Sequence, residues 1–222
     1  MRFALSTVRP KDSNMVQGRQ DSFYNGWLYH LFVDPTLRKV RKLVRSQVAK
    51  GSSLIDIGCG TGELVFSLVD LCCELVGVET SYRMWSYASQ RARAQGLTNL
   101  RIVFADGAEL INLPTGFFDY ATACMVLHEM NVDQRLPLLR KMQRLASTLI
   151  LVDYRVPPPA NLTGIMCRLI ERLAGRRHYH NYLSYLRGGG LMTLLEAQQG
   201  LVEKEILLYN RCIHLVRVRL CG

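Results

Sequence analysis

Short apolar runs alternate with longer amphipathic segments through the middle of the chain. Runs rich in Val, Ile and Leu predict buried strands, and segments with apolar residues three or four positions apart predict helices. Strands that alternate with helices in this way indicate an α/β fold, in which a parallel sheet lies between two layers of helices. The pattern predicts strands over residues 53–57, 74–79, 100–104, 118–124 and 147–153, and helices over 61–71, 81–95, 107–111 and 132–145.

The segments on either side of this alternation have different patterns. Residues 22–33 are rich in aromatic side chains, and 36–49 have the pattern of a basic amphipathic helix. Three prolines that begin at Pro157 interrupt the alternation after the fifth strand. Beyond them we expect a helix over 161–174, a flexible joint at Gly188–Gly190, a helix that ends near Gln198, and strands near 201–208 and 211–219.

The last two strands are separated only by Tyr209 and Asn210, which predicts a hairpin and therefore one antiparallel strand in the sheet. The length of 222 residues suits one α/β domain with additions. We expect a single domain over residues 1–222, composed of an N-terminal extension (1–50), a ligand-binding core (51–155), a cap (156–190), and a terminal helix with the hairpin (191–222).

Composition excludes several classes of protein. The chain has no run of about 18 consecutive apolar residues, which argues against a transmembrane helix. Its N-terminal apolar stretch is too short for a signal peptide. The seven cysteines are odd in number and form no CxxC pair, which argues against a disulfide framework and against a zinc site. We therefore expect a cytoplasmic protein with reduced thiols.

The formal net charge of +10 is unevenly distributed along the chain. Residues 1–50 carry +7 and residues 151–222 carry +5, whereas residues 51–150 carry −2. Basic ends around a near-neutral core fit contact with an acidic partner, such as anionic lipid headgroups, phosphate or RNA. A solubilising surface without a partner explains the same charges equally well.

A glycine-rich loop directly follows the first predicted strand. Its sequence, Gly58-Cys59-Gly60-Thr61-Gly62, comes after Asp56 near the strand end. Glycines let the backbone turn sharply and approach a ligand closely, and the following helix start favours a carboxylate or a phosphate. A dinucleotide-binding loop needs its third glycine at position 63, which is Glu63 here. The spacing therefore argues against NAD and FAD.

Acidic residues also follow the next two strands. Glu79 ends the second strand, where a carboxylate can accept hydrogen bonds from both hydroxyls of a ribose. Asp106 follows the third strand, where it can accept from the amino group of an adenine or can cap a helix. Met84 can pack on an adenine ring, although core packing is the commoner role of such a residue. Together these residues indicate an adenosine-binding site at the carboxyl edge of the sheet.

These motifs resemble those of class I S-adenosylmethionine-dependent methyltransferases, and the chain is most similar to the ubiquinone/menaquinone methyltransferase-like group of small-molecule enzymes. The resemblance covers roughly residues 50–155. It implies a three-layer, Rossmann-like, mostly parallel sheet of seven strands in the order 3-2-1-4-5-7-6, with the last strand antiparallel, N-terminal helices and a small helical cap. It rests on Leu54–Gly62, Val76–Glu79, Asp106, Phe118–Asp119 and Leu127–Glu129.

The resemblance also implies that S-adenosylmethionine is the cofactor. The glycines would cradle its methionine moiety, with Asp56 near the ammonium group, Glu79 on the ribose, and Asp106 with Gly107 at the adenine. Met125 would lie under the methionine moiety through its backbone. The complete set expected to contact the cofactor is Asp56, Gly58, Cys59, Gly60, Gly62, Glu79, Thr80, Met84, Asp106, Gly107 and Met125.

The acceptor side is less well defined. The chain has Cys124–Leu127 where methyltransferases that act on amino groups of nucleic acids carry Asn/Asp-Pro-Pro-Tyr/Phe, which argues against that chemistry. His128 is the candidate general base, with a structural role in the loop as the alternative. The pair His178 and His180 suggests a metal, but no nearby carboxylate or cysteine completes a ligand set, so no metal is expected. The residues expected to line the acceptor pocket are Tyr24, Tyr29, His178, His180 and Tyr182.

The sequence therefore predicts a methyltransferase for a small lipophilic or aromatic acceptor, quinol-like or lipid. Residues 161–174 form an amphipathic helix that either covers the domain as a lid or rests on a membrane interface. The alternatives are a methyltransferase for RNA or protein, and a protein that binds S-adenosylmethionine without catalysis. The sequence does not predict the oligomeric state.

Overall fold

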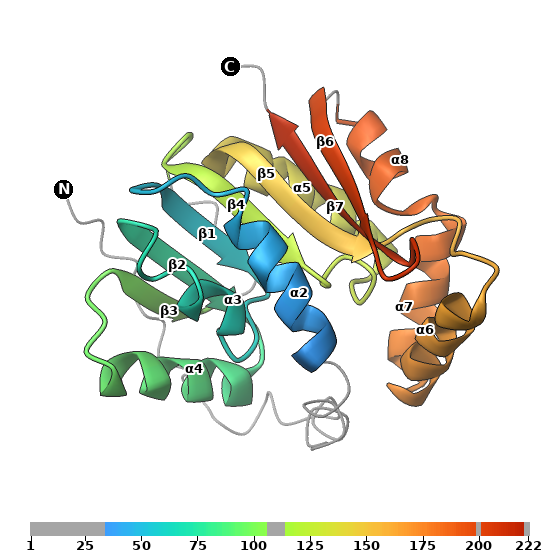
Figure 1. Cartoon of the computed structure of the whole chain (residues 1–222), viewed down its shortest axis with the longest axis horizontal. Coiled ribbons are helices and arrows are strands. Elements are labelled where there is room, and N and C mark those ends of the chain that lie inside the picture. The colour runs from blue at the N-terminus through green and yellow to red at the C-terminus, as the bar shows by residue number, and fades with distance from the viewer. Residues whose placement is uncertain (1–33, 106–113, 199–200, 220–222) are drawn as a thin grey trace.

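The computed structural model describes residues 34–105, 114–198 and 201–219. Its centre is a seven-stranded sheet in the order β3-β2-β1-β4-β5-β7-β6 (Figure 1). Strands β1 to β5 pair in parallel, and β7 pairs antiparallel with both β5 and β6. The predicted fold class and strand order are thus confirmed. The strands are β1 (Ser53–Ile57), β2 (Glu74–Glu79), β3 (Leu100–Phe104), β4 (Phe118–Cys124), β5 (Ala146–Tyr154), β6 (Leu201–Leu208) and β7 (Ile213–Arg219).

Helices flank the sheet on both faces. In the view of Figure 1, α2 crosses in front of the sheet and α5 lies behind it, while α6 and α7 lie beyond the carboxyl end of β5. None of the described helices has the length and the apolar character needed to cross a bilayer. The helices are α2 (Asp34–Arg45), α3 (Glu63–Phe66), α4 (Tyr82–Ala94), α5 (Val132–Leu145), α6 (Leu162–Leu173), α7 (Arg176–Arg187) and α8 (Gly190–Glu196).

The apolar runs that predicted the strands form the core. Every residue of β5 except Ser147 is buried, as expected for a strand that is covered on both faces. In α2, Val40 and Val44 are fully buried, whereas Arg38 and Lys39 are exposed. The predicted basic amphipathic helix therefore packs its apolar face on the domain and turns its basic face to solvent.

The helix after the glycine loop is shorter than predicted. The pattern predicted residues 61–71, but α3 ends at Phe66 and turns follow. Side chains from other elements bind the carbonyl groups of this stretch: Arg45 donates to Ser67 O at 2.5 Å, and Asn99 donates to Val69 O at 2.8 Å. These long-range partners satisfy carbonyls that a continued helix would use internally.

The terminal hairpin has a longer turn than predicted. The turn covers four residues, Tyr209 to Cys212, instead of two, and the first three have φ angles of 50°, 52° and 69°. The amide of Cys212 donates to Leu208 O at 3.1 Å and so closes the turn. The expected flexible joint is a tight connection between α7 and α8, in which a Cβ at Gly189 would lie 2.1 Å from the Thr193 hydroxyl.

Candidate cofactor and acceptor site

The glycine loop leaves β1 at the carboxyl edge of the sheet and turns through three left-handed glycines. Gly58, Gly60 and Gly62 have φ angles of 72°, 57° and 86°. A Cβ at Gly58 would lie 2.6 Å from Val126 Cγ2, and one at Gly62 would lie 2.7 Å from the Phe66 ring. At Gly60 the nearest atom is Met84 Sδ, at 3.8 Å. The first and third glycines therefore pack against the protein, while the middle one faces space that a ligand can fill.

Glu79 connects this loop to the end of β2. Its Oε2 accepts a hydrogen bond from the Gly60 amide at 2.8 Å, and its Oε1 accepts from the Ser81 amide at 2.7 Å. The side chain is 7% exposed, so it lies at the inner edge of the loop. A carboxylate oxygen can accept more than one hydrogen bond, and these oxygens can therefore also accept from ribose hydroxyls, as the sequence predicts.

Asp56 lies behind the loop and is almost fully buried. Its Oδ1 accepts a hydrogen bond of 2.6 Å from the Thr122 hydroxyl on β4. Burial raises the pKa of Asp56 to about 7, with a further contribution from the nearby Glu79 carboxylate, although the Thr122 hydrogen bond acts in the opposite direction. A cation beside this group, such as the ammonium of an amino acid, would favour its charged form.

The raised pKa of Asp56 predicts a pH-dependent stability. Because the folded-state pKa lies above that of an unfolded Asp, the folded protein binds more protons between about pH 4 and about pH 7. The contribution of Asp56 to stability is complete below about pH 4 and is lost as the pH rises to about 7, by up to about 4 kcal/mol. Urea unfolding should show the free energy of unfolding of the wild type fall, relative to that of Asp56→Asn, as the pH rises from about 4 to about 7. A constant difference between the two proteins would contradict the burial argument.

The other predicted cofactor contacts in the described residues surround the same loop. Met84 is half-buried on α4 below Gly60, and Thr80 is exposed directly after Glu79. Cys59 is buried, and its amide donates to Val78 O at 3.1 Å. Met125 follows β4 with a φ of 59°, which is a strained angle for a residue with a side chain and is common at binding sites.

Glu63 does not point into the loop. It forms an ion pair with Arg91 on α4, whose guanidinium lies over the Phe66 ring at 4.1 Å. A carboxylate near the start of a helix would by itself disfavour a pyrophosphate, but Arg91 neutralises this one. The argument against NAD and FAD therefore depends on the glycine spacing.

Four predicted site residues lie outside the described residues. They are Asp106 and Gly107, expected at the adenine, and Tyr24 and Tyr29, expected at the acceptor pocket. Their roles stay predictions.

His128, the candidate base, lies in the loop after β4 and is 2% exposed. Its Nδ1 is 2.7 Å from Asp153 Oδ1 at the end of β5, and its Nε2 is 3.8 Å from Glu171 Oε2 on α6. Asp153 also accepts hydrogen bonds from the Leu127 and His128 amides at 2.9 and 3.2 Å. The loop that holds His128 is thus fixed through one buried carboxylate.

The electrostatic setting of His128 stabilises its charged form. Burial acts to lower its pKa, but the carboxylates of Asp153, Glu171 and Glu129 outweigh burial and raise the pKa to about 9. A general base must be neutral before it accepts a proton, so this setting does not favour the base role at neutral pH. The role of His128 in catalysis stays a prediction.

Comparison with known proteins agrees with this geometry. Residues 54–148, which include the glycine loop, Glu79 and β4, match the family described as methyltransferase domain. This segment therefore resembles class I S-adenosylmethionine-dependent methyltransferases, and the chain spans about half the length of the curated relatives that it matches. The chain is 29% identical to a demethylmenaquinone methyltransferase of Geobacillus kaustophilus over 146 residues, which cover 64% of this chain and 56% of that protein. It is 26% identical over 128 residues to a probable S-adenosylmethionine-dependent methyltransferase of Saccharomyces cerevisiae, which cover 56% of this chain and 42% of that protein.

Solved structures share the fold of this chain at low sequence identity. A methyltransferase from Aquifex aeolicus matches with a TM-score of 0.60 and 17% identity over 83% of this chain and 93% of that one. Magnesium protoporphyrin IX methyltransferase from Synechocystis, with bound S-adenosylhomocysteine, matches with a TM-score of 0.59 and 21% identity over 85% of this chain and 84% of that one.

The structure places the other predicted acceptor residues on α7. His178 is half-buried and forms a hydrogen bond with Glu171. Tyr182 is fully buried, with its ring 6.3 Å from that of His128. His180 is exposed, so α7 directs it away from this cluster. Of the predicted pair, only His178 lies at the site.

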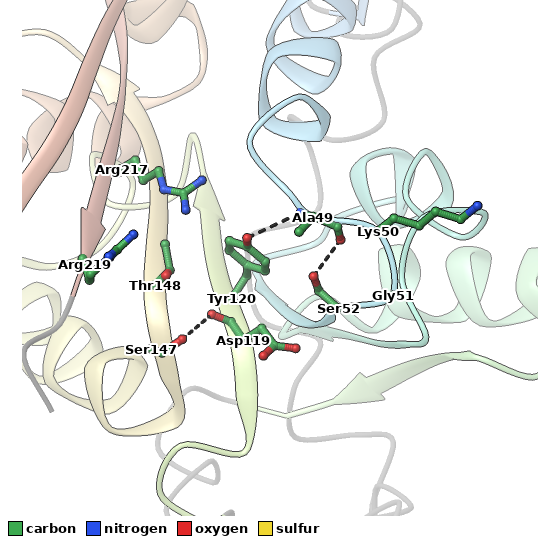
Figure 2. A pocket seen from close by; sticks show the side chains of 10 residues that line it. All are labelled: Ala49, Lys50, Gly51, Ser52, Asp119, Tyr120, Ser147, Thr148, Arg217 and Arg219. Carbon is green, nitrogen blue, oxygen red and sulfur yellow. Dashed lines mark hydrogen bonds between the residues drawn. The ribbon is translucent and has the colours of Figure 1, made fainter.

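A pocket of about 540 Å³ lies at the opposite edge of the sheet (Figure 2). It is lined by the amino-terminal ends of β4 and β5 and by Lys50, Arg217 and Arg219. Because ligands of open α/β sheets bind at the carboxyl ends of the strands, this pocket does not coincide with the candidate cofactor site.

Three residues of the acceptor side were missed from the sequence: Asp153, Tyr154 and Glu171. The first two end the fifth strand at the carboxyl edge, which is the signal that identified Glu79 on the second strand. Glu171 is the single acid in the helix over 161–174, where it is 5% exposed. The sequence argued against a metal because it showed no carboxylate near His178. In the structure Glu171 provides that carboxylate, so this argument no longer holds.

Proposed function

We propose that the protein transfers a methyl group from S-adenosylmethionine to a small lipophilic acceptor, such as a quinol-like or lipid molecule, that it collects from a membrane surface. The observation that carries the acceptor class is the exposed apolar surface of α6. Six large apolar side chains of this 12-residue helix are between 38% and 74% exposed. They are Leu162, Ile165, Met166, Leu169, Ile170 and Leu173.

The surroundings of α6 support a membrane as the contact. Arg168 and Arg172 on the helix, and Arg176 and Arg177 directly after it, are exposed. An apolar helix surface with arginines beside it favours the interface of an anionic bilayer, where the side chains enter the acyl region and the cations contact headgroups. Since α6 also packs against α7, which carries His178 and Tyr182, an acceptor that enters along α6 arrives beside the site.

The likeness to demethylmenaquinone methyltransferases supports the same acceptor class, since their name denotes a lipophilic quinone-type substrate. The sulfonium of S-adenosylmethionine supplies the activated methyl group. The work of the protein is to hold the reactants in line and to exclude water. The glycine loop, Glu79 and Met125 surround the cofactor, while His128 and Tyr182 close the site on the α7 side.

The role of α6 predicts binding to anionic vesicles. We expect the wild type to float with phosphatidylglycerol-containing liposomes, and the double variant Ile165→Glu with Leu169→Glu to show at least a tenfold lower partition coefficient. Each buried aliphatic side chain contributes roughly 2 kcal/mol to such binding, and a charge on the apolar surface opposes it. Flotation and quantification of the bound fraction measure the effect.

The matched control is Val132→Glu, which introduces the same charge at a 65% exposed apolar residue on α5. This variant should bind liposomes like the wild type. Absence of flotation by the wild type, or equal loss in the control, would contradict the membrane proposal. Tight RNA binding whose affinity falls steeply with salt would instead favour an RNA acceptor.

A further inference from the structure

A buried cluster on the acceptor side brings together three metal-ligating side chains from separate elements. They are His128 from the loop after β4, Glu171 from α6 and His178 from α7, and their ligand atoms all lie within 4.8 Å of one another. His128 Nε2 is 3.8 Å from Glu171 Oε2, and the same oxygen is hydrogen-bonded to His178 Nε2. One carboxylate oxygen therefore faces two imidazole nitrogens.

Neighbouring groups orient two of the three side chains. Asp153 binds His128 Nδ1 at 2.7 Å, which leaves Nε2 directed towards Glu171. The Tyr154 hydroxyl donates to Glu171 Oε1 at 2.7 Å, which leaves Oε2 directed towards both histidines. A carboxylate behind a ligating histidine, and a hydrogen bond to the second oxygen of a ligating carboxylate, are the outer contacts that metal sites use to fix their ligands.

The cluster also has an unused donor. The hydroxyl of Tyr182 is buried and finds no hydrogen-bond partner within the part of the chain that the structure describes. The Tyr182 ring lies 5.2 Å from the Tyr154 ring and 6.3 Å from that of His128. A buried hydroxyl without a partner is unfavourable, so a bound oxygen atom, of water or of a ligand, would stabilise this hydroxyl.

We propose that His128, Glu171 and His178 bind one divalent transition-metal ion of the zinc type through Nε2, Oε2 and Nε2. Two histidines and one carboxylate leave a coordination position open, as in catalytic zinc sites and unlike the four-ligand structural sites. Bonds of about 2 Å to a tetrahedral ion place ligand atoms about 3.3 Å apart, close to the observed separation of His128 and Glu171. The ion takes the place of the proton between Glu171 Oε2 and His178 Nε2, and these two atoms move apart to accommodate it.

The open position would bind a hydroxyl oxygen of the acceptor and lower the pKa of that hydroxyl, so that its proton leaves to solvent water. The oxygen would then bond to the methyl carbon as the bond from that carbon to the sulfonium sulfur breaks, which releases S-adenosylhomocysteine. This catalytic role rests on the proposed methyl transfer, whereas metal binding does not. Coordination uses the lone pair of His128 Nε2, so in the metal-loaded protein His128 does not accept the acceptor's proton itself. It acts on the acceptor through the ion.

Cobalt titration tests the site without any substrate. Protein treated with a chelator and then exchanged into metal-free buffer should bind one Co²⁺ per chain, with the visible bands of a nitrogen and oxygen site. Glu171→Gln and His178→Gln should each weaken binding at least tenfold, and Tyr154→Phe should weaken it roughly tenfold through the lost outer contact. The matched control is His180→Gln, two positions along α7 and exposed, which should bind Co²⁺ like the wild type.

Circular dichroism and thermal melting confirm that each variant is folded. Failure of the wild type to bind Co²⁺, or equal binding by Glu171→Gln and His178→Gln, would overturn the site. A sulfur-to-cobalt band that disappears in Cys167→Ser would place the metal at the Cys167–Cys212 pair, whose Sγ atoms are 2.7 Å apart, and would also overturn it. If methyl transfer does not change when the metal is removed, the catalytic role of the ion is overturned, but metal binding is not. If the protein binds Co²⁺ and transfers no methyl group, the proposed function is overturned, but the metal site is not.

Discussion

Replacing Glu79 with Ala is expected to lower the affinity for S-adenosylmethionine roughly 100-fold, about 3 kcal/mol. Hydrogen bonds to a charged group contribute about 1.5–3 kcal/mol each, and the ribose offers two hydroxyls to this carboxylate. The substitution also leaves the amides of Gly60 and Ser81 without their partner, so the loop loses the contact that connects it to β2. Both effects weaken binding, the first by lost contacts and the second by lost preorganisation.

Isothermal titration with S-adenosylmethionine measures this effect. The matched control is Glu74→Ala, at the other end of the same strand, where the carboxylate forms a partly exposed ion pair with Arg101. Such pairs contribute at most about 1 kcal/mol to stability, so this variant should bind the cofactor like the wild type. Unchanged affinity in Glu79→Ala would contradict the assignment of the ribose to this carboxylate.

Gly58→Ala is expected to lower the free energy of unfolding by about 3 kcal/mol and to abolish measurable cofactor binding. A φ of 72° costs a residue with a Cβ about 1–2 kcal/mol, and the added atom would lie 2.6 Å from Val126 Cγ2. Relief of this overlap must move either the glycine loop or the segment after Met125. Both of these segments belong to the candidate cofactor site, so stability and cofactor binding are expected to fall together.

Two further variants separate backbone strain from overlap. Gly51 has a comparable φ of 82°, but a Cβ added there would meet no atom within 4 Å. Gly51→Ala should therefore lower the free energy of unfolding by only about 1 kcal/mol and leave cofactor binding intact. Adding Val126→Ala to Gly58→Ala removes the overlapping atoms, so the double variant should be more stable than the sum of the two single changes indicates. Urea unfolding of the wild type, the three single variants and the double variant measures these effects, and equal losses in Gly51→Ala and Gly58→Ala would contradict the packing argument.

The candidate cofactor residues could be proposed from the sequence because their signals are local. Gly58, Gly60 and Gly62 need left-handed backbone angles, and a run of such glycines after an apolar strand already predicts a tight ligand loop. Glu79 was identified for the same reason, since each strand end in a parallel sheet lies at one edge. The order of the strands followed from the resemblance to the methyltransferases and is confirmed by the structure.

One error arose where side chains from distant segments bind the local backbone, and a second arose where unusual backbone angles lengthen a turn. The helix over 61–71 ends early because Arg45 and Asn99 bind carbonyls of that stretch. The hairpin turn includes Arg211 and Cys212 because three successive residues adopt left-handed angles that residue type does not predict there. Neither effect is visible in hydrophobic periodicity.

Periodicity, glycine spacing and strand-end acids are all short-range patterns. They predicted the strands of the sheet, which the structure confirms, and they suggested a methyl-donor site that stays a prediction. The acceptor side depended on tertiary structure. The three residues of the proposed metal site come from separate elements: His128 from the loop after β4, Glu171 from α6 and His178 from α7. Only the packing of α6 and α7 against the end of β5 brings their nitrogens and oxygen within 4.8 Å of one another. The physical reason is that charged groups are buried only where a partner compensates them, and here each partner comes from another element.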